Sequence, residues 1–220
     1  MDEIIQGSAE WHALRCGKVT ASRVADVIAK TQKGWGVSRT NYAAELVAEM
    51  LTGATTEGFT STAMQWGKDT EPMARDAYSF MTGETISEVP FVSHPNISDA
   101  GASPDGLIGD DGLVEIKCPN MATHIATLRG RSVPGQYITQ MMWQMACTGR
   151  SYCDFVSYDP RMPESMRLFY KRVQRDDAMI AELEREVVIF LNEVRGTVAE
   201  LRRLYEPAQA DTAASMLMAG

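Results

Sequence analysis

The chain has 220 residues, of which 45% are hydrophobic, so it is long enough to bury a core. We expect one domain over residues 1–206 and a weakly patterned C-terminal tail over residues 207–220. The formal net charge of -8 excludes general attraction to nucleic acid, so any such contact must be local, through a basic lining on an acidic body. Four cysteines without paired metal spacing indicate reduced thiols, and no stretch approaches the ~20 apolar residues of a membrane helix. We therefore expect a cytoplasmic protein with no membrane segment.

The N-terminal region is predicted to hold two short helices with a polar segment between them. Ser8 is a candidate N-cap for a helix that ends near Gly17, and a second helix is expected from Thr20. By residue type alone, Arg15 is a solvated cation at a helix end.

Residues 30–36, Lys-Thr-Gln-Lys-Gly-Trp-Gly, are basic and glycine-bearing and are expected to form an exposed loop. One interpretation is an ordinary connector, with Trp35 packed onto the core. The other is a loop that touches a nucleic-acid duplex, with Lys30 and Lys33 on phosphates. An amphipathic helix over residues 40–52 is expected to follow.

The next predicted helix, residues 63–81, contains Glu71 directly before Pro72. Proline lacks an amide donor and clashes with the preceding turn, so the helix is expected to restart or kink at Pro72. A lone glutamate on a helix is usually solvated, so residue type alone assigns Glu71 to a solvated face.

Residues 101–119, Gly-Ala-Ser-Pro-Asp-Gly-Leu-Ile-Gly-Asp-Asp-Gly-Leu-Val-Glu-Ile-Lys-Cys-Pro, are the most informative stretch. Two short apolar segments flank the turn sequence Gly-Asp-Asp-Gly at residues 109–112, which predicts a β-hairpin. Strands over residues 85–93 and 97–102 are expected to lead into it.

The hairpin is expected to gather charged side chains at one place. Because strand side chains alternate, Glu115 and Lys117 should share one face while Ile116 points to the other. Folding would bring Asp105 near Glu115, and two carboxylates can arrange ligands for Mg²⁺ while a lysine orients or deprotonates water. The alternative is an ordinary hairpin with a charged, solvated face.

The rest of the chain is predicted to supply helices and two strands. A helix over residues 134–147 carries Gln140, which is a surface residue by default. Two strands over residues 152–158 and 166–173 follow, and a long helix over residues 175–205 has apolar residues at helical spacing.

Ordered strings across residues 11–173 resemble the phage lambda exonuclease family, the viral recombinase branch of the PD-(D/E)xK nuclease superfamily. The strings are Trp11-His-x-Leu-Arg-x-Gly-x-x-Thr-Ala-Ser22, Trp66-Gly-Lys-x-x-Glu71, Ser103-Pro-Asp-Gly with Glu115-Ile-Lys-Cys-Pro119, Tyr137-x-x-Gln140 and Tyr158-Asp-Pro-Arg-Met162. Pro72, directly after the matched glutamate, departs from the family pattern.

The resemblance implies a role for each matched residue. The implied catalytic residues are Asp105, Glu115, Lys117 and Glu71. The implied metal ligands are Asp105, Glu115, Ile116 and Glu71. The implied 5′-phosphate ligands are Arg15, Ser22, Ser103 and Gln140. The DNA contacts at Lys30, Lys33 and Trp35 rest on a looser match.

The resemblance also implies the fold and the activity. The fold would be α/β, a mixed central sheet flanked by helices around a restriction-endonuclease-like PD-(D/E)xK core, and the single domain would be a nuclease domain. The activity would be 5′ to 3′ digestion of one strand of linear double-stranded DNA with two Mg²⁺ ions, or Mn²⁺ in their place. The implied partners are double-stranded DNA ends, a single-strand annealing protein in phage-type recombination, and two further copies in a homotrimer ring. The source would be a bacterial host or a prophage.

Two other functions remain open at this point. A PD-(D/E)xK endonuclease of restriction or junction-resolving type would share Asp105, Glu115 and Lys117 but would not need a 5′-phosphate pocket. A non-catalytic DNA-binding assembly protein would keep the carboxylates for structure only.

Overall fold

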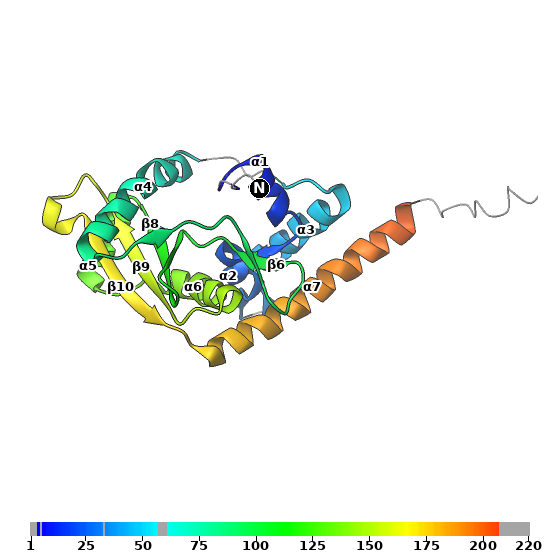
Figure 1. The fold of residues 1–220 in the computed structure, drawn as a ribbon. Helices are drawn as coiled ribbons and strands as arrows, with labels where there is room; N and C mark the ends of the chain where they lie inside the picture. The colour runs from blue at the N-terminus through cyan, green and yellow to red at the C-terminus, as the bar shows by residue number, and fades with distance from the viewer. Residues whose placement is uncertain (1–3, 5, 33, 57–60, 207–220) are drawn as a thin grey trace, which may run out of the picture.

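The computed structural model describes residues 4, 6–32, 34–56 and 61–206, so Lys33 and the predicted tail lie outside the described residues. The body is a mixed five-stranded sheet, ordered β10-β9-β8-β7-β4, with helices on both faces (Figure 1). This arrangement confirms the predicted α/β fold class. The strands are β4 (Ile86–Ser87), β7 (Gly106–Ile108), β8 (Gly112–Lys117), β9 (Tyr152–Tyr158) and β10 (Leu168–Gln174).

Strand β8 is the centre of the sheet. It pairs antiparallel with β7, which confirms the predicted hairpin, and parallel with β9 on its other side. Leu113 lies in the core shared with α6 (Gly135–Thr148), whereas Val114 and Ile116 lie in a second core against α4 (Thr62–Thr82). Because strand side chains alternate, Glu115 and Lys117 belong to the α6 side of β8.

The remaining elements surround this sheet. A small sheet of β1 (Val19–Thr20), β6 (Ala100–Ala102) and β5 (Val92–Ser93) lies beside it, and β6 leads into β7. The helices not yet given are α1 (Ala9–Arg15), the 3-10 helix η1 (Ala21–Arg23), α2 (Val24–Val27), α3 (Val37–Thr52), α5 (Met121–Gly130), the 3-10 helix η2 (Glu164–Met166) and α7 (Asp177–Tyr205).

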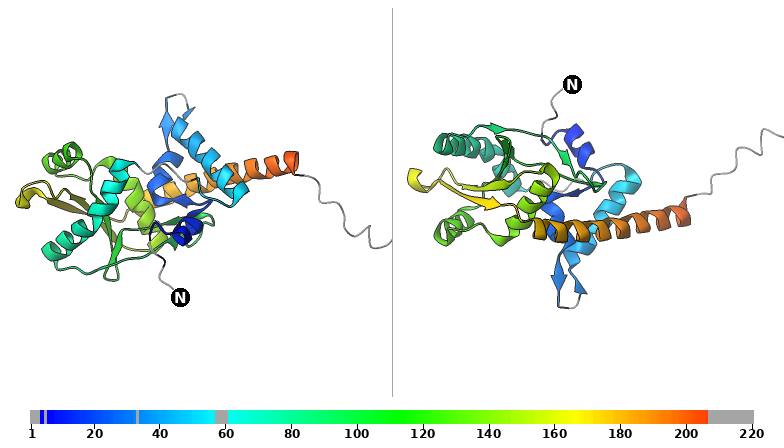
Figure 2. Two further views of the ribbon diagram at one scale, coloured as in Figure 1. Left: turned by 90° about the horizontal axis from the view of Figure 1, so that it is seen from above. Right: turned by 60° about the horizontal axis from the view of Figure 1, so that its bottom comes forward.

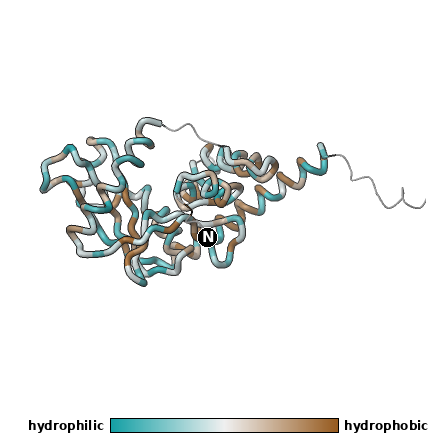
Figure 3. The backbone as a smooth tube through the Cα atoms, turned by 45° about the horizontal axis from the view of Figure 1, so that its top comes forward, coloured by the Kyte–Doolittle hydropathy of each residue, from teal (hydrophilic) through white to brown (hydrophobic). Residues whose placement is uncertain are grey.

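Helix α7 confirms the predicted long amphipathic helix. Hydrophobic and hydrophilic residues alternate along its tube (Figure 3), and its buried residues pack mainly against α3, α2 and α6. Its last turns extend beyond the body (Figure 1). None of the helices in the described ranges is long and apolar enough to cross a membrane.

The structure corrects two local expectations and narrows a third. The segment 30–36 is a hairpin of β2 (Lys30–Thr31) and β3 (Gly34–Trp35) that projects from the body (Figure 2), because backbone pairing satisfies polar groups that a loop would leave to water. Helix α4 is continuous through Pro72, so of the two expected alternatives, a restart or a kink, the restart does not occur. Burial of Thr70, Ala74 and Tyr78 offsets the roughly 3 kcal/mol that an interior proline costs. The second predicted helix begins one residue late, as a 3-10 turn, because Thr20 pairs in β1.

Gly101 in β6 allows close packing just before the hairpin. A Cβ atom at Gly101 would lie 2.6 Å from the Val92 carbonyl oxygen and would overlap the Phe91 ring. We therefore expect Gly101→Ala to lower the free energy of unfolding by about 1–3 kcal/mol, measured by urea denaturation. The control is Gly196→Ala in α7, where nothing lies within 4 Å of the added carbon and a gain of up to about 1 kcal/mol is expected. Equal stability of the Gly101→Ala variant and the wild type would contradict the close contact.

Candidate functional site

The hairpin of β7 and β8 brings the three residues of the central motif together. Asp105 directly precedes β7, and its Oδ2 accepts a hydrogen bond from the Ile116 amide at 2.7 Å. The Asp105 side chain therefore takes the place of a main-chain partner where β7 has not yet begun. The N–H and C=O of one strand residue point to the same side, so the Ile116 carbonyl also faces Asp105.

Glu115 is fully buried and its two carboxylate oxygens have different partners. Lys117 forms an ion pair with Oε1, which confirms that the two side chains share a face. Gln140 Nε2 donates to the same oxygen at 2.6 Å, and Gln144 Nε2 donates to Oε2 at 2.6 Å. A buried carboxylate of this kind needs such donors, because an unpaired buried charge is very costly.

Glu71 approaches this group from α4. Arg75, one turn further along the helix, forms an ion pair with Glu71 at 2.8 Å and a second ion pair with Glu88. Arg75 also donates to the Asp105 carbonyl at 3.4 Å, so it links α4 to the start of β7.

The charges of this cluster act on one another. Burial raises the pKa of Asp105 well above its ordinary value, and the neighbouring Glu115 raises it further. Burial also raises the pKa of Glu71, partly offset by Arg75. Burial works against the charge of Lys117, but Glu115 and Asp105 outweigh it and raise the pKa of the ammonium. Lys117 is therefore a cation at neutral pH.

The donor set fits a hard divalent cation. Carboxylate and main-chain oxygens are the ligands that Mg²⁺ takes, and the carboxylates of Asp105, Glu115 and Glu71 lie near enough to act on one another electrostatically. Within the described ranges, no group of three His, Cys, Asp or Glu side chains is already arranged to hold a metal ion. Lys117 and Arg75 each contact one carboxylate oxygen of this group, on Glu115 and Glu71 respectively.

A second polar group lies at the other end of the Ser103-Pro-Asp segment. Arg15 donates to Ser103 Oγ at 3.2 Å, and Trp11 Nε1 donates to the same oxygen at 3.1 Å. The Arg15 guanidinium stacks on the Trp11 ring at 4.1 Å. Because Ser103 Oγ accepts two hydrogen bonds, its own proton is free to be donated to a third group.

Arg15 has the properties of an anion-binding residue. Burial lowers its pKa, although a guanidinium still stays charged. In the described part of the chain, no carboxylate lies within ion-pair distance of Arg15. A partly desolvated arginine beside the Ser103 hydroxyl is suited to a phosphate.

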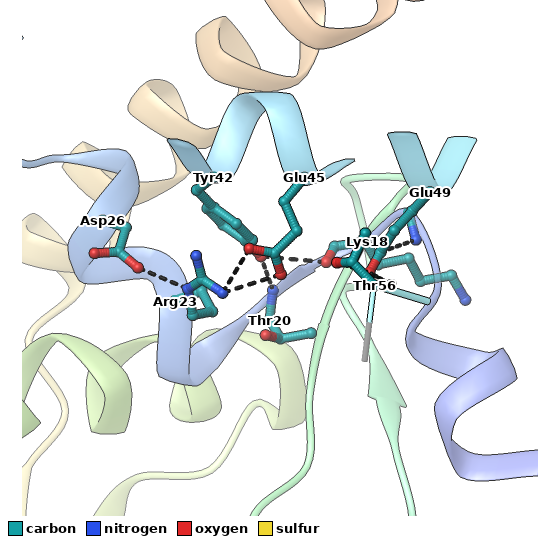
Figure 4. A network of polar contacts seen from close by, with 9 residues as sticks. Lys18, Thr20, Arg23, Asp26, Tyr42, Glu45, Glu49 and Thr56 are labelled. Atoms are coloured by element: carbon teal, nitrogen blue, oxygen red, sulfur yellow. Dashed lines mark hydrogen bonds and ion pairs between the residues drawn. The ribbon is translucent and has the colours of Figure 1, made fainter. Parts of the chain in front are cut away.

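The turn after Arg15 is fixed to α3 by the polar network shown in Figure 4. Glu49 accepts a hydrogen bond from the Gly17 amide at 2.7 Å and another from the Thr56 amide at 3.0 Å. The Tyr42 hydroxyl accepts from the Thr20 amide at 3.2 Å and donates to the Lys18 carbonyl. Helix α3 therefore sets the position of the segment that carries Arg15.

Two of the predicted phosphate ligands form no hydrogen bond with Arg15 or Ser103 among the described residues. Ser22 is exposed in η1, and among the described contacts none joins it to Arg15 or Ser103. Gln140 contacts Glu115 and so belongs to the carboxylate cluster. Hydrogen bonds thus join Arg15 to Ser103, while the turn η1 that carries Ser22 packs against α6, the helix of Gln140, and against β6, the strand before Ser103.

The predicted DNA-contact residues lie on the projecting hairpin. Lys30 forms an ion pair with Glu186 of α7 at 3.2 Å. Trp35 is 44% exposed and stacks on Arg39 at 4.1 Å, so it is not buried in the core. These contacts attach the hairpin to α3 and α7. Lys33 lies outside the described residues.

Sequence reasoning missed three residues that the fold places at these sites. Gln144 lies one turn after Gln140, Trp11 one turn before Arg15, and Arg75 one turn after Glu71. Helical spacing could have identified these three residues, because residues four apart on a helix lie on the same face.

A mixed sheet whose central strand carries Glu115 and Lys117 beside Asp105 defines a core of the PD-(D/E)xK nuclease type. The family model of the YqaJ-like viral recombinase domain matches residues 10–151. The chain belongs to this family.

Solved structures give the same result. The alkaline exonuclease LHK-Exo from Laribacter hongkongensis is 50% identical, with a TM-score of 0.85 over 95% of this chain and 100% of that chain. The structure of LHK-Exo in complex with dAMP gives the same values. A phage-related exonuclease from Haemophilus somnus shares the fold, with 14% identity and a TM-score of 0.69 over 84% of this chain and 96% of that chain. No curated protein sequence matches the chain.

Proposed function

We propose that the chain is a metal-dependent DNA exonuclease that digests one strand of linear double-stranded DNA from 5′ to 3′ and leaves a 3′ overhang. One observation carries this proposal: Ser103, the hydrogen-bond partner of Arg15, and Asp105 of the carboxylate cluster lie on one segment of three residues, which we take as the link between a 5′-phosphate pocket and the metal site. A terminal phosphate held in the pocket would place the adjacent phosphodiester at the carboxylates. The likeness to LHK-Exo, which is an alkaline exonuclease, supports the assignment.

The residues of the carboxylate cluster would have different roles in hydrolysis. Asp105, Glu115, Glu71 and the Ile116 carbonyl would hold two Mg²⁺ ions, or Mn²⁺ in their place. Bound there, such ions would supply Lewis-acid polarisation of the phosphodiester and activation of a water molecule at neutral pH. The Lys117 ammonium stabilises negative charge that develops on the phosphate oxygens, which matters mainly in the transition state. Arg15 and Ser103 orient the 5′ end.

We also propose that the enzyme acts as a homotrimer ring that encloses DNA and passes the overhang to a single-strand annealing protein in phage-type recombination. An apolar groove of about 490 Å³ between α3 and α7 supports subunit contacts, and Leu204 and Tyr205 are exposed at the end of α7. Exposed apolar surface of this kind is typical of interfaces. The groove is lined by Ala43, Ala44, Val47, Ala48, Leu51, Thr197 and Leu201.

Digestion of matched linear and circular duplexes tests the proposed function. With Mg²⁺, we expect the linear duplex to be degraded and the circle to stay intact, because the pocket requires a 5′ end. Chelation of the metal should stop digestion. A 5′ label should be released before a 3′ label. Cutting of the circle would instead identify an endonuclease, and a folded protein that digests neither DNA would identify a binding protein.

A further inference from the structure

We propose that Gln144 is a positioning residue that fixes the carboxylate plane of Glu115, so that Oε1 faces the metal-binding side and Oε2 is held inside the protein. The inference rests on the proposed function, because it concerns the same carboxylate cluster. It assigns a role to a residue that the sequence motifs do not contain.

The two oxygens of Glu115 have different surroundings. Gln144 is fully buried and donates to Oε2 at 2.6 Å. The partners of Oε1 are Lys117 and Gln140, and the Lys117 side chain is 28% exposed. A cation that approaches from the open side therefore meets Oε1 first, while the amide of Gln144 keeps hold of Oε2.

The orientation of the Gln144 amide follows from its neighbours. A carboxylate only accepts hydrogen bonds, so the NH₂ end of the amide must face Glu115. The opposite end, Oε1 of Gln144, faces the Cys153 thiol on β9, a weak donor at 3.9 Å. Gln144, on α6, is thus held by a hydrogen bond at each end of its amide, to Glu115 of β8 and to Cys153 of β9.

A neutral amide suits this role better than a charged side chain. It orients the carboxylate without adding a second positive charge beside that of Lys117, so more of the negative charge of Glu115 is left to attract a metal ion. A lysine at the same place would compete with the metal. Hydrogen-bond partners behind metal ligands typically contribute 10- to 100-fold in metal affinity or activity.

The test compares Gln144→Met with Gln136→Met, a control of the same residue type that is exposed on the same helix. Binding of Mn²⁺ in the absence of DNA is measured by titration calorimetry, together with the Mg²⁺ concentration that gives half the maximal rate. We expect Gln144→Met to weaken Mn²⁺ binding and to raise the Mg²⁺ requirement by about 10- to 100-fold, with DNA-end affinity unchanged. Gln136→Met should match the wild type.

The outcomes separate the inference from the function it rests on. A folded Gln144→Met variant with wild-type Mn²⁺ affinity would overturn the role of Gln144. If that variant does not fold, Gln144→Asn keeps a polar amide but is one methylene too short to reach Glu115, and it should show the same loss of affinity. Wild-type affinity in the Asn variant would again overturn the role. If the wild type binds no Mn²⁺, or Asp105→Ala binds it equally well, the proposed function itself fails.

Discussion

Asp105→Asn is expected to reduce the rate of DNA digestion by about 10³-fold or more while the protein stays folded. The asparagine oxygen can still accept the hydrogen bond of the Ile116 amide, so the start of β7 keeps its partner. The substitution removes the negative charge that a divalent cation needs. Single-turnover digestion of a linear duplex measures the rate, and thermal unfolding measures the fold.

The hairpin also provides a control for this experiment. Asp110→Asn removes the same charge from the exposed turn between β7 and β8 and should leave the rate unchanged. Asp105→Ala should be as inactive as Asp105→Asn but less stable, because it leaves the Ile116 amide without its acceptor. A folded Asp105→Asn protein with a wild-type rate would exclude Asp105 as a metal ligand.

Arg15→Ala is expected to reduce the preference for a 5′-phosphorylated end by about 10- to 100-fold, since a charge-assisted hydrogen bond is worth about 1.5–3 kcal/mol. A terminal phosphate carries more negative charge than an internal diester, and the guanidinium fork binds two of its oxygens. Digestion rates of matched duplexes with 5′-phosphate or 5′-hydroxyl ends give the preference.

Two further variants show whether the geometry of Arg15 matters. Arg15→Lys should restore part of the preference, because the ammonium keeps the charge but loses the fork and its stack on Trp11. Arg185→Ala, an exposed position on α7, should keep the full preference. A wild type without any preference, or an Arg15→Ala variant that keeps it, would exclude the phosphate pocket.

The parts of the fold that could be predicted depend on local signals. The turn chemistry of residues 109–112 and the alternation of β8 give the hairpin and the shared face of Glu115 and Lys117. Gly53 ends α3 in the left-handed conformation, as its position after an amphipathic run indicates. These features need no information from distant parts of the chain.

The features that could not be predicted depend on tertiary contacts. The expected exposed loop at residues 30–36 is a hairpin attached to α7, and the ion pair between Lys30 and Glu186 joins residues 156 positions apart. The strands expected over residues 85–93 and 97–102 are shorter, because only a few of their residues find partners. Gln140 contacts Glu115 because of the way α6 packs on the sheet, which no local motif specifies.

The segment from Ser103 to Asp105 has a consequence for the size of the product. Two residues of chain separate their Cα atoms by at most about 7 Å, which is the scale of one nucleotide step along a DNA strand. If Ser103 binds the terminal phosphate and Asp105 lies at the cleaved bond, this short segment sets the distance between the terminal phosphate and the cleavage position. Each cut then releases a single mononucleotide, and every cut leaves a new 5′-phosphate that fits the same pocket.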